Sequence, residues 1–393
     1  MRVLTRHMRD TRKGESSTNL VDGITSMDFQ NVNSLNAWLN LLSGNLMPIT
    51  NNSSFPISWK LYGTVIWLFQ LFYTVTLIAS FFFVPIEKTL NDGLTVLIVI
   101  MEENSIILRI HQHSSLIQQL IQKLNDAFNI KDENLKNIVT ANLNPMKTPF
   151  KFYFVTVFPS LIVWFSLPNI LILERNTFYY VDYKAPAIYS KEPFSTNIFV
   201  LGNTIMTVAN LFIFLKKISV EVYIAHLISL VTSQYQYIAL RFVLIFQNYD
   251  QPNINRDIRN VCRQHKNILY ITQMLRKFLS LTICIIYLNN VFRFCFLGFM
   301  MSRISVSLFD GFMIFIYASG SVIQFYIICN CFQKLSEAAS EITDKAFHEN
   351  WYKCNSSVKR VFLLMIMASN NLTLKLALFE RFNLNLSSFM SVR

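Results

Sequence analysis

The side chains best suited to catalysis or metal binding occur in this sequence without the spacing that such chemistry needs. His348 and Glu349 begin an H-E pattern, but position 352 is a tyrosine rather than the second histidine of a zinc-binding H-E-x-x-H helix. His111 and His113 are two residues apart, so they do not share a helix face. The few glycines form no phosphate-binding loop. We therefore expect no enzyme, no cofactor and no bound metal.

Charged residues within apolar segments are a second group that could do chemistry. Glu102 and Glu103 interrupt an apolar stretch, and carboxylates inside a membrane are functional candidates by default. The alternative, which we favour, places them toward the polar end of a helix, facing water or partners. Arg293 and Asp310 are expected in adjacent helices, where a charge pair costs less than two separate charges in lipid. Equally, Asp310 and Ser307 could cap a helix while Arg293 snorkels to the interface.

A third group of residues favours the binding of a small molecule. The outer halves of predicted spans two to six are rich in aliphatic and aromatic side chains and carry few hydroxyls or amides. Such a lining suits a small hydrophobic ligand, although ordinary packing between helices explains the same residues. The candidate ligand-binding residues are Val96, Val99, Trp164, Phe165, Asn169, Asn203, Thr207, Phe312 and Tyr317.

The composition places these residues in a membrane protein. Of 393 residues, 52% are hydrophobic and only 15% are charged, whereas soluble domains carry about 25% charged residues. The net charge of +12 arises from basic residues that lie between apolar segments. That is the pattern of cytosolic loops, so we expect contact with membrane lipid and no nucleic acid.

Apolar segments predict an all-α polytopic membrane helix bundle, with six full transmembrane helices and an incomplete seventh, in a single domain over 1–393. About 20 apolar residues suffice to cross a bilayer. The segment 1–58 is expected in the cytosol, with an apolar patch from Leu35 to Met47 that docks on the bundle or lies at the interface. Residues 61–332 hold spans one to six, and 333–393 hold an anchor helix and a seventh apolar segment too short to cross before Arg393. The predicted spans are 61–84, about 90–110, 152–173, 196–217, 278–300 and about 307–332.

Helices and a loop outside the lipid complete the predicted architecture. Ser114 to Ile130 carries a one-sided apolar stripe typical of a helix that packs on other helices. The fourth helix is expected to continue past Lys216 to about Phe246 and to project into the cytosol. The tyrosine-rich loop 178–194 is either an interfacial lid or a headgroup anchor.

Loop charges predict a cytosolic N-terminus. The N-terminal region and the segments after spans two, four and six carry most of the lysines and arginines, and the segments after spans one, three and five carry few. This parity is opposite to that of a G-protein-coupled receptor, which is therefore the less favoured class. A secondary transporter is disfavoured because no paired broken helices in inverted repeats are present.

Two blocks of sequence resemble the insect odorant receptor family. One is QKLSEAASEITDKAFHENWY, followed by KRVFLLMIMASNN and LNLSSF; the other is CRQHKNILYITQMLRKFLS. The resemblance is to a variable tuning subunit rather than to the shared co-receptor. It implies a receptor in the plasma membrane of sensory-neuron dendrites that binds a small hydrophobic odorant. It also implies a cation channel, formed as a hetero-tetramer with an obligate co-receptor. A gustatory receptor of the same fold is the alternative.

The same resemblance implies where subunits meet. Carried over residue by residue, the candidate subunit-anchor residues are His265, Ser336, Trp351 and Tyr352. The family pattern continues beyond LNLSSF into the pore-lining half of the last helix. A truncated isoform, an incomplete gene model and a subunit that relies on partners for the pore are therefore three open interpretations.

Overall fold

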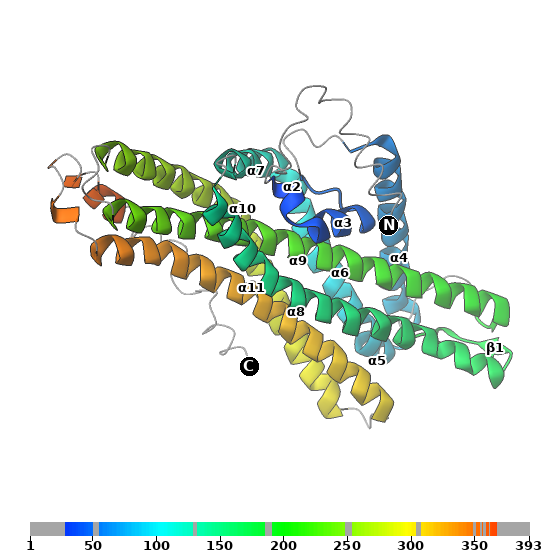
Figure 1. Cartoon of the computed structure of the whole chain (residues 1–393). Coiled ribbons are helices and arrows are strands. Elements are labelled where there is room, and N and C mark those ends of the chain that lie inside the picture. The colour runs from blue at the N-terminus through cyan, green and yellow to red at the C-terminus, as the bar shows by residue number, and fades with distance from the viewer. Residues whose placement is uncertain are drawn as a thin grey trace.

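The computed structural model of the chain is a bundle of long helices (Figure 1). It describes residues 28–49, 55–128, 132–184, 191–247, 254–303, 308–348 and 351–353, together with 356, 359–360 and 362–367. Most of the N-terminal segment and the predicted seventh segment lie outside these residues. The seventh span therefore stays a prediction.

Five of the described helices are long and apolar enough to cross a membrane. They cover predicted spans one, three, four, five and six, and the prediction of an all-α polytopic membrane bundle is confirmed. These helices are α4 (Ile57–Phe83), α8 (Glu133–Ser166), α9 (Thr196–Gln247), α10 (Ile254–Arg303) and α11 (Leu308–His348), with α8 continued by the 3-10 helix η2 (Leu167–Leu173).

The second predicted span forms a helix that is less apolar than the other five. It is α6 (Leu94–Gln112), reached from α4 through the short α5 (Ile86–Lys88) and the π-helical turn η1 (Thr89–Gly93). Glu102, Glu103 and Arg109 interrupt its apolar sequence. A helix with charged residues inside a membrane is stable only if neighbouring helices supply partners for those charges.

Helix α9 is the centre of the bundle. It packs against α4, α6, α8, α10 and α11, and Figure 1 shows it running through the middle of the molecule. At 1.5 Å per residue its 52 residues reach about 78 Å, more than twice the ~30 Å of a hydrocarbon core. The prediction of one continuous helix is confirmed. Its second half is nevertheless buried among other helices, including Glu221, His226 and Gln234.

The apolar patch near the N-terminus docks on α9. It forms α2 (Phe29–Val32) and α3 (Ser34–Leu42), and α3 packs directly on the central helix. The Asn40 amide closes the following turn, donating to and accepting from the Met47 backbone at 2.8 Å. The Tyr223 hydroxyl on α9 donates to the Pro48 carbonyl at 2.7 Å. Of the two predicted alternatives, docking on the bundle is confirmed.

The one-sided stripe predicted after span two is also confirmed. It forms α7 (Ser114–Phe128), whose apolar side packs against α10. Ile117, Leu120, Ile121 and Leu124 are almost fully buried. Apolar residues three and four apart gather on one side of a helix, which is why the sequence pattern identified the buried face.

The tyrosine-rich loop packs onto the beginning of α9. Its ends pair as two short antiparallel strands, β1 (Thr177–Phe178) and β2 (Phe194–Ser195), with the 3-10 turn η3 (Tyr180–Asp182) between them. Phe178 stacks on Phe199 of α9 with ring centroids 4.1 Å apart. Phe178, Tyr183 and Phe194 are at most 2% exposed. These three rings pack on protein, whereas Tyr179 is 43% exposed, and the choice between lid and headgroup anchor stays a prediction.

Helices α8 and α11 pack closely at Gly320. A β-carbon at this position would lie 2.7 Å from Val157 and 3.1 Å from Tyr153, whereas one at Gly298 of α10 would meet no atom within 4 Å. We expect Gly320→Ala to lower the free energy of unfolding by about 1–3 kcal/mol through overpacking. Gly298→Ala should instead raise it by up to about 1 kcal/mol, because alanine is the better helix former. Unfolding of both variants in detergent, followed by circular dichroism, measures the difference, and equal shifts would contradict the packing at Gly320.

Candidate functional site

A cavity of about 150 Å³ lies between α6, α8, α9, α10 and α11. Five of the nine predicted ligand-binding residues line it: Val96, Val99, Trp164, Phe165 and Tyr317. The rest of its wall is largely aliphatic and aromatic, with few polar groups. The other lining residues are Thr95, Tyr153, Val157, Ser160, Leu161, Asn210, Ile213, Phe214, Lys217, Arg293, Leu297, Met300, Met313 and Ile314.

The parts of the five helices that line the cavity all lie toward the same side of the bundle. The lining comes from the first turns of α6 and α11, the second halves of α8 and α10, and the first half of α9. With the predicted cytosolic N-terminus, all five of these ends lie in the outer half of the membrane. This is the depth at which the sequence analysis expects a ligand, and ligand binding there stays a prediction.

The other four predicted residues do not line this cavity. Asn169 and Asn203 bond to each other, with the Asn203 amide donating to the Asn169 oxygen at 2.9 Å. The Thr207 hydroxyl donates to the Asn203 carbonyl at 2.9 Å, one turn earlier on α9. Phe312 is 58% exposed on α11. Helix periodicity alone could not separate these positions from the five that face the cavity.

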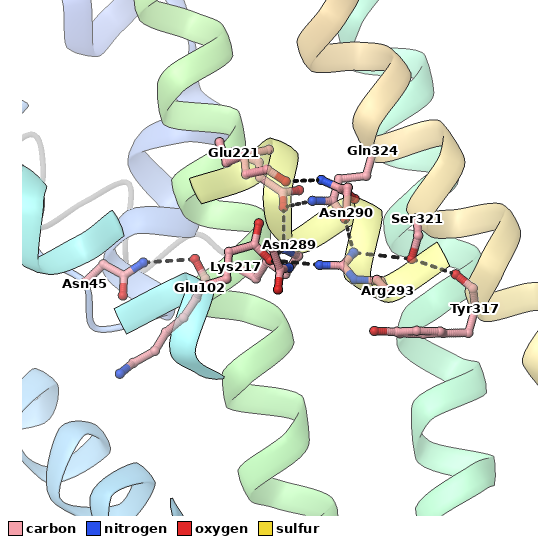
Figure 2. Close-up of polar contacts among 12 residues, drawn as sticks. Asn45, Glu102, Lys217, Glu221, Asn289, Asn290, Arg293, Tyr317, Ser321 and Gln324 are labelled. Carbon is pink, nitrogen blue, oxygen red and sulfur yellow. Dashed lines mark hydrogen bonds and ion pairs between the residues drawn. The ribbon is translucent and has the colours of Figure 1, made fainter. Parts of the chain in front are cut away.

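The base of the cavity is polar, because Lys217 and Arg293 both reach it from a buried ion network (Figure 2). One oxygen of Glu102 on α6 accepts from the Lys217 ammonium at 2.5 Å and from the Arg293 guanidinium at 2.8 Å. The same oxygen accepts from the Asn289 amide. All three charged residues are at most 6% exposed. One carboxylate thus joins α6, α9 and α10.

Glu221 extends the network to α11. It lies one turn after Lys217 on α9, and its carboxylate is 3.3 Å from the Lys217 ammonium. It also accepts from the Gln324 amide of α11. The Arg293 guanidinium donates to Gln324 at 3.1 Å and to Ser321 at 3.3 Å. Four helices are therefore held together by hydrogen bonds to these few charges.

A second buried pair lies beside the first. The Lys216 ammonium is 3.9 Å from Glu103 and donates to the Gln70 amide oxygen of α4. It also lies 3.6 Å from the centroid of the Trp67 ring, a cation–π distance. The Gln70 amide in turn donates to Glu103 at 3.4 Å. Because charges within a bilayer are costly unless paired, these contacts explain how α6 and α9 keep them there.

The structure corrects the favoured interpretation of Glu102 and Glu103 and one of the two even alternatives for Arg293. Glu102 and Glu103 face other helices rather than water, and they are 3% and 1% exposed. Arg293 is 2% exposed, so it does not snorkel, and the described carboxylate with which it pairs is Glu102. The side chain of Asp310 lies outside the described residues. Two adjacent carboxylates in span two and two adjacent lysines in span four were the signal that could have predicted this pairing.

The loop after α8 touches the cavity wall through Lys184. Its ammonium lies 4.3 Å from the centroid of the Trp164 ring, and Trp164 lines the cavity. Such a contact contributes about 0.5–1 kcal/mol at an exposed site. We expect Lys184→Gln to increase hydrogen exchange of the backbone amides of 177–183 several-fold, and the exposed Lys191→Gln to leave it unchanged. Equal exchange in the two variants would show that the contact does not hold the loop.

The four candidate subunit-anchor residues lie away from the cavity, in the other halves of α10 and α11 and just beyond. His265 is buried on α10, Ser336 lies on α11, and Trp351 and Tyr352 form the 3-10 turn η4 (Trp351–Lys353). Trp351 stacks on Phe362 with ring centroids 5.2 Å apart, whereas Tyr352 is 57% exposed. Of the four, Tyr352 is the most available to another subunit.

Comparison with known proteins identifies the family. The family model for the 7tm odorant receptor matches residues 88–393, which is most of the chain. The chain belongs to the odorant receptor family. Membership favours the odorant over the gustatory alternative and agrees with the expectation that the chain is not an enzyme. In the part of the chain that the structure describes, no group of three metal-ligating side chains lies close together.

Individual odorant receptors are distant relatives of this chain. Putative odorant receptor 92a of Drosophila melanogaster is 26% identical over 120 residues, which is 30% of this chain and 29% of that protein. Odorant receptor 85b of the same fly is 23% identical over 124 residues, which is 32% of each. The chain thus matches about a third of the length of these curated relatives.

Solved structures share the fold over almost the whole chain. The olfactory receptor OR5 from Machilis hrabei aligns with a TM-score of 0.74 and 12% identity, covering 91% of this chain and 93% of that one. The structure of the same receptor in complex with eugenol aligns with a TM-score of 0.76 and 13% identity, covering 92% of this chain and 94% of that one. At such low identity the likeness establishes the fold.

Proposed function

We propose that this chain is an odorant receptor subunit that binds a small volatile, apolar molecule in the cavity between α6, α8, α9, α10 and α11. The observation that carries the proposal is the cavity itself. Aromatic and aliphatic side chains dominate its lining, which also includes a few polar side chains, among them Lys217 and Arg293. A mostly apolar pocket with a few convergent polar groups is the usual form of a site for a small organic ligand.

The size of the cavity limits the ligand to a small molecule. A cavity of about 150 Å³ in another protein holds benzene, so we expect ligands of roughly that size here. The Machilis receptor whose structure was solved with eugenol shows that the shared fold can hold an aromatic volatile.

We further propose that the ligand acts on a cation channel formed with an obligate co-receptor, in the plasma membrane of sensory-neuron dendrites. The ion network supports this step, because it joins the base of the cavity to α11 through Arg293, Ser321 and Gln324. The other end of α11 leads to the candidate anchor residues, which as proposed contact neighbouring subunits. One rigid helix thus connects the ligand site with the proposed subunit interface.

Recording odour-evoked cation current tests this function. The full chain is expressed with and without the co-receptor and challenged with a panel of volatiles of about six to nine heavy atoms, a size range taken from the cavity. We expect current only when both subunits are present, and lower sensitivity in variants that fill the cavity. Current from the chain alone would contradict the need for a partner. No binding and no current with any volatile of this size would contradict the function.

A further inference from the structure

Arg293 lines the cavity, and its guanidinium has a hydrogen-bond donor without a partner among the described groups. Arginine carries five N–H donors. One terminal nitrogen of Arg293 donates to Ser321 and Gln324, and the other donates to Glu102 at 2.8 Å. The remaining nitrogen, Nε, is buried and has no hydrogen-bond partner among the described groups. A buried donor without an acceptor carries an unfavourable desolvation cost, which a ligand oxygen could remove.

The surrounding charges determine what kind of acceptor fits. The described buried cluster holds three carboxylates, Glu102, Glu103 and Glu221, and three cations, Lys216, Lys217 and Arg293. Their formal charges cancel, and Arg293 is already paired with Glu102. An anionic ligand would therefore bring a fourth negative charge, close to Glu102, into a site of low polarity. A neutral oxygen can accept one hydrogen bond without that cost.

We propose that Arg293 is a specificity-determining residue that selects small neutral volatiles carrying a hydrogen-bond acceptor, such as a ketone oxygen, over hydrocarbons of the same shape. The Arg293 Nε–H donates to that oxygen at the base of the cavity. The hydrocarbon part of the ligand lies against Val96, Val99 and Trp164, which line the same cavity. The proposal deepens the ligand-binding function above and rests on it.

A pair of ligands with the same shape tests this selectivity on the unaltered chain. Cyclohexanone and methylenecyclohexane differ by an oxygen in place of a CH₂ group, and both are close in size to benzene. The full chain in lipid nanodiscs is titrated with each, and the dissociation constants are taken from thermal stabilisation. Because a hydrogen bond from a charged donor is among the stronger ones, we expect the Kd of the ketone to be roughly ten- to hundredfold lower. Cyclopentanecarboxylate should bind no more tightly than the hydrocarbon.

Two charge-neutral double variants assign the effect to Arg293. Arg293→Met with Glu102→Gln removes one charge of each sign together with the Nε donor, and should bring the ratio of the two dissociation constants close to one. Lys216→Met with Glu103→Gln removes a buried pair of the same network but leaves Arg293 in place, so the ketone preference should remain.

The outcomes separate the inference from the function on which it rests. Equal affinity for ketone and hydrocarbon in the unaltered chain overturns the role of Arg293 and leaves the ligand site intact. Tighter binding of the carboxylate than of the ketone overturns the requirement for a neutral ligand. A ketone preference that survives in the folded Arg293 variant overturns the assignment to this residue. Should that variant fail to fold, the ligand pair on the unaltered chain still tests the proposal, because equal affinity for the two ligands overturns it. Binding of neither neutral ligand, nor of any other volatile of this size, contradicts the proposed function itself.

Discussion

Glu102→Leu is expected to lower the free energy of unfolding by about 3–5 kcal/mol, the cost of removing one partner from a buried ion pair. The Glu102 carboxylate accepts from Lys217 and Arg293 through a single oxygen. Without it, two almost fully buried cations remain near Glu221 inside the bundle with one carboxylate fewer to balance them. We expect the variant to be largely absent from the cell surface and, when purified, to unfold at a lower denaturant concentration.

An exposed ion pair of the same chain is the matched control. On α11 the Lys345 ammonium lies 2.6 Å from a carboxylate oxygen of Glu341, and the side chains of Glu341 and Lys345 are 38% and 41% exposed. Pairs of this kind contribute at most about 0.5 kcal/mol, so Glu341→Leu should hardly change the stability. A comparable loss in both variants would mean that burial adds nothing at Glu102, and the structural role of the network would be wrong.

Val99→Trp is expected to abolish most of the response to small volatiles while leaving the receptor at the cell surface. Val99 lines the cavity from α6, and an indole at this position occupies the space that a ligand needs. Loss of the apolar contacts of a benzene-sized ligand should raise the half-maximal concentration by about tenfold or more. Dose–response curves of current, normalised to surface protein, measure the effect.

Val65→Trp provides the control for this substitution. Val65 lies on α4, outside the cavity lining, and is 57% exposed in the bundle, as expected for a side chain that meets lipid. The same change in side-chain size should leave the dose–response curve in place. An unshifted curve in Val99→Trp, or an equal shift in both variants, would place the ligand elsewhere.

The sequence predicted the helices well because their signals are local. The uncharged stretch of α4, the one-sided stripe of α7 and the unbroken run of α9 each depend on residues close together in the chain. The resemblance of the C-terminal blocks identified the family for a similar reason. Five of the nine predicted ligand-binding residues line the cavity, because the general character of the outer helix ends sets the depth in the membrane but not the direction around a helix.

The ion network could not be predicted in the same way because its partners are far apart in the sequence. Glu102 and Arg293 lie on helices whose facing sides are set by packing, and no local period encodes which pairs meet. A single charged residue, considered by itself, is best explained as lying near the end of a helix, where its side chain faces water. The sequence indicates buried ion pairs only through the match between two adjacent carboxylates in span two and two adjacent lysines in span four, which are spans that pack together.

A structure of the full chain with bromobenzene bound tests the central claim most directly, since bromine marks the position of a small apolar ligand in the density. We expect bromine density inside the cavity, within contact distance of Val96, Trp164 and Phe165. Density at the lipid-facing surface of the bundle, with the cavity empty at saturating ligand, would contradict it.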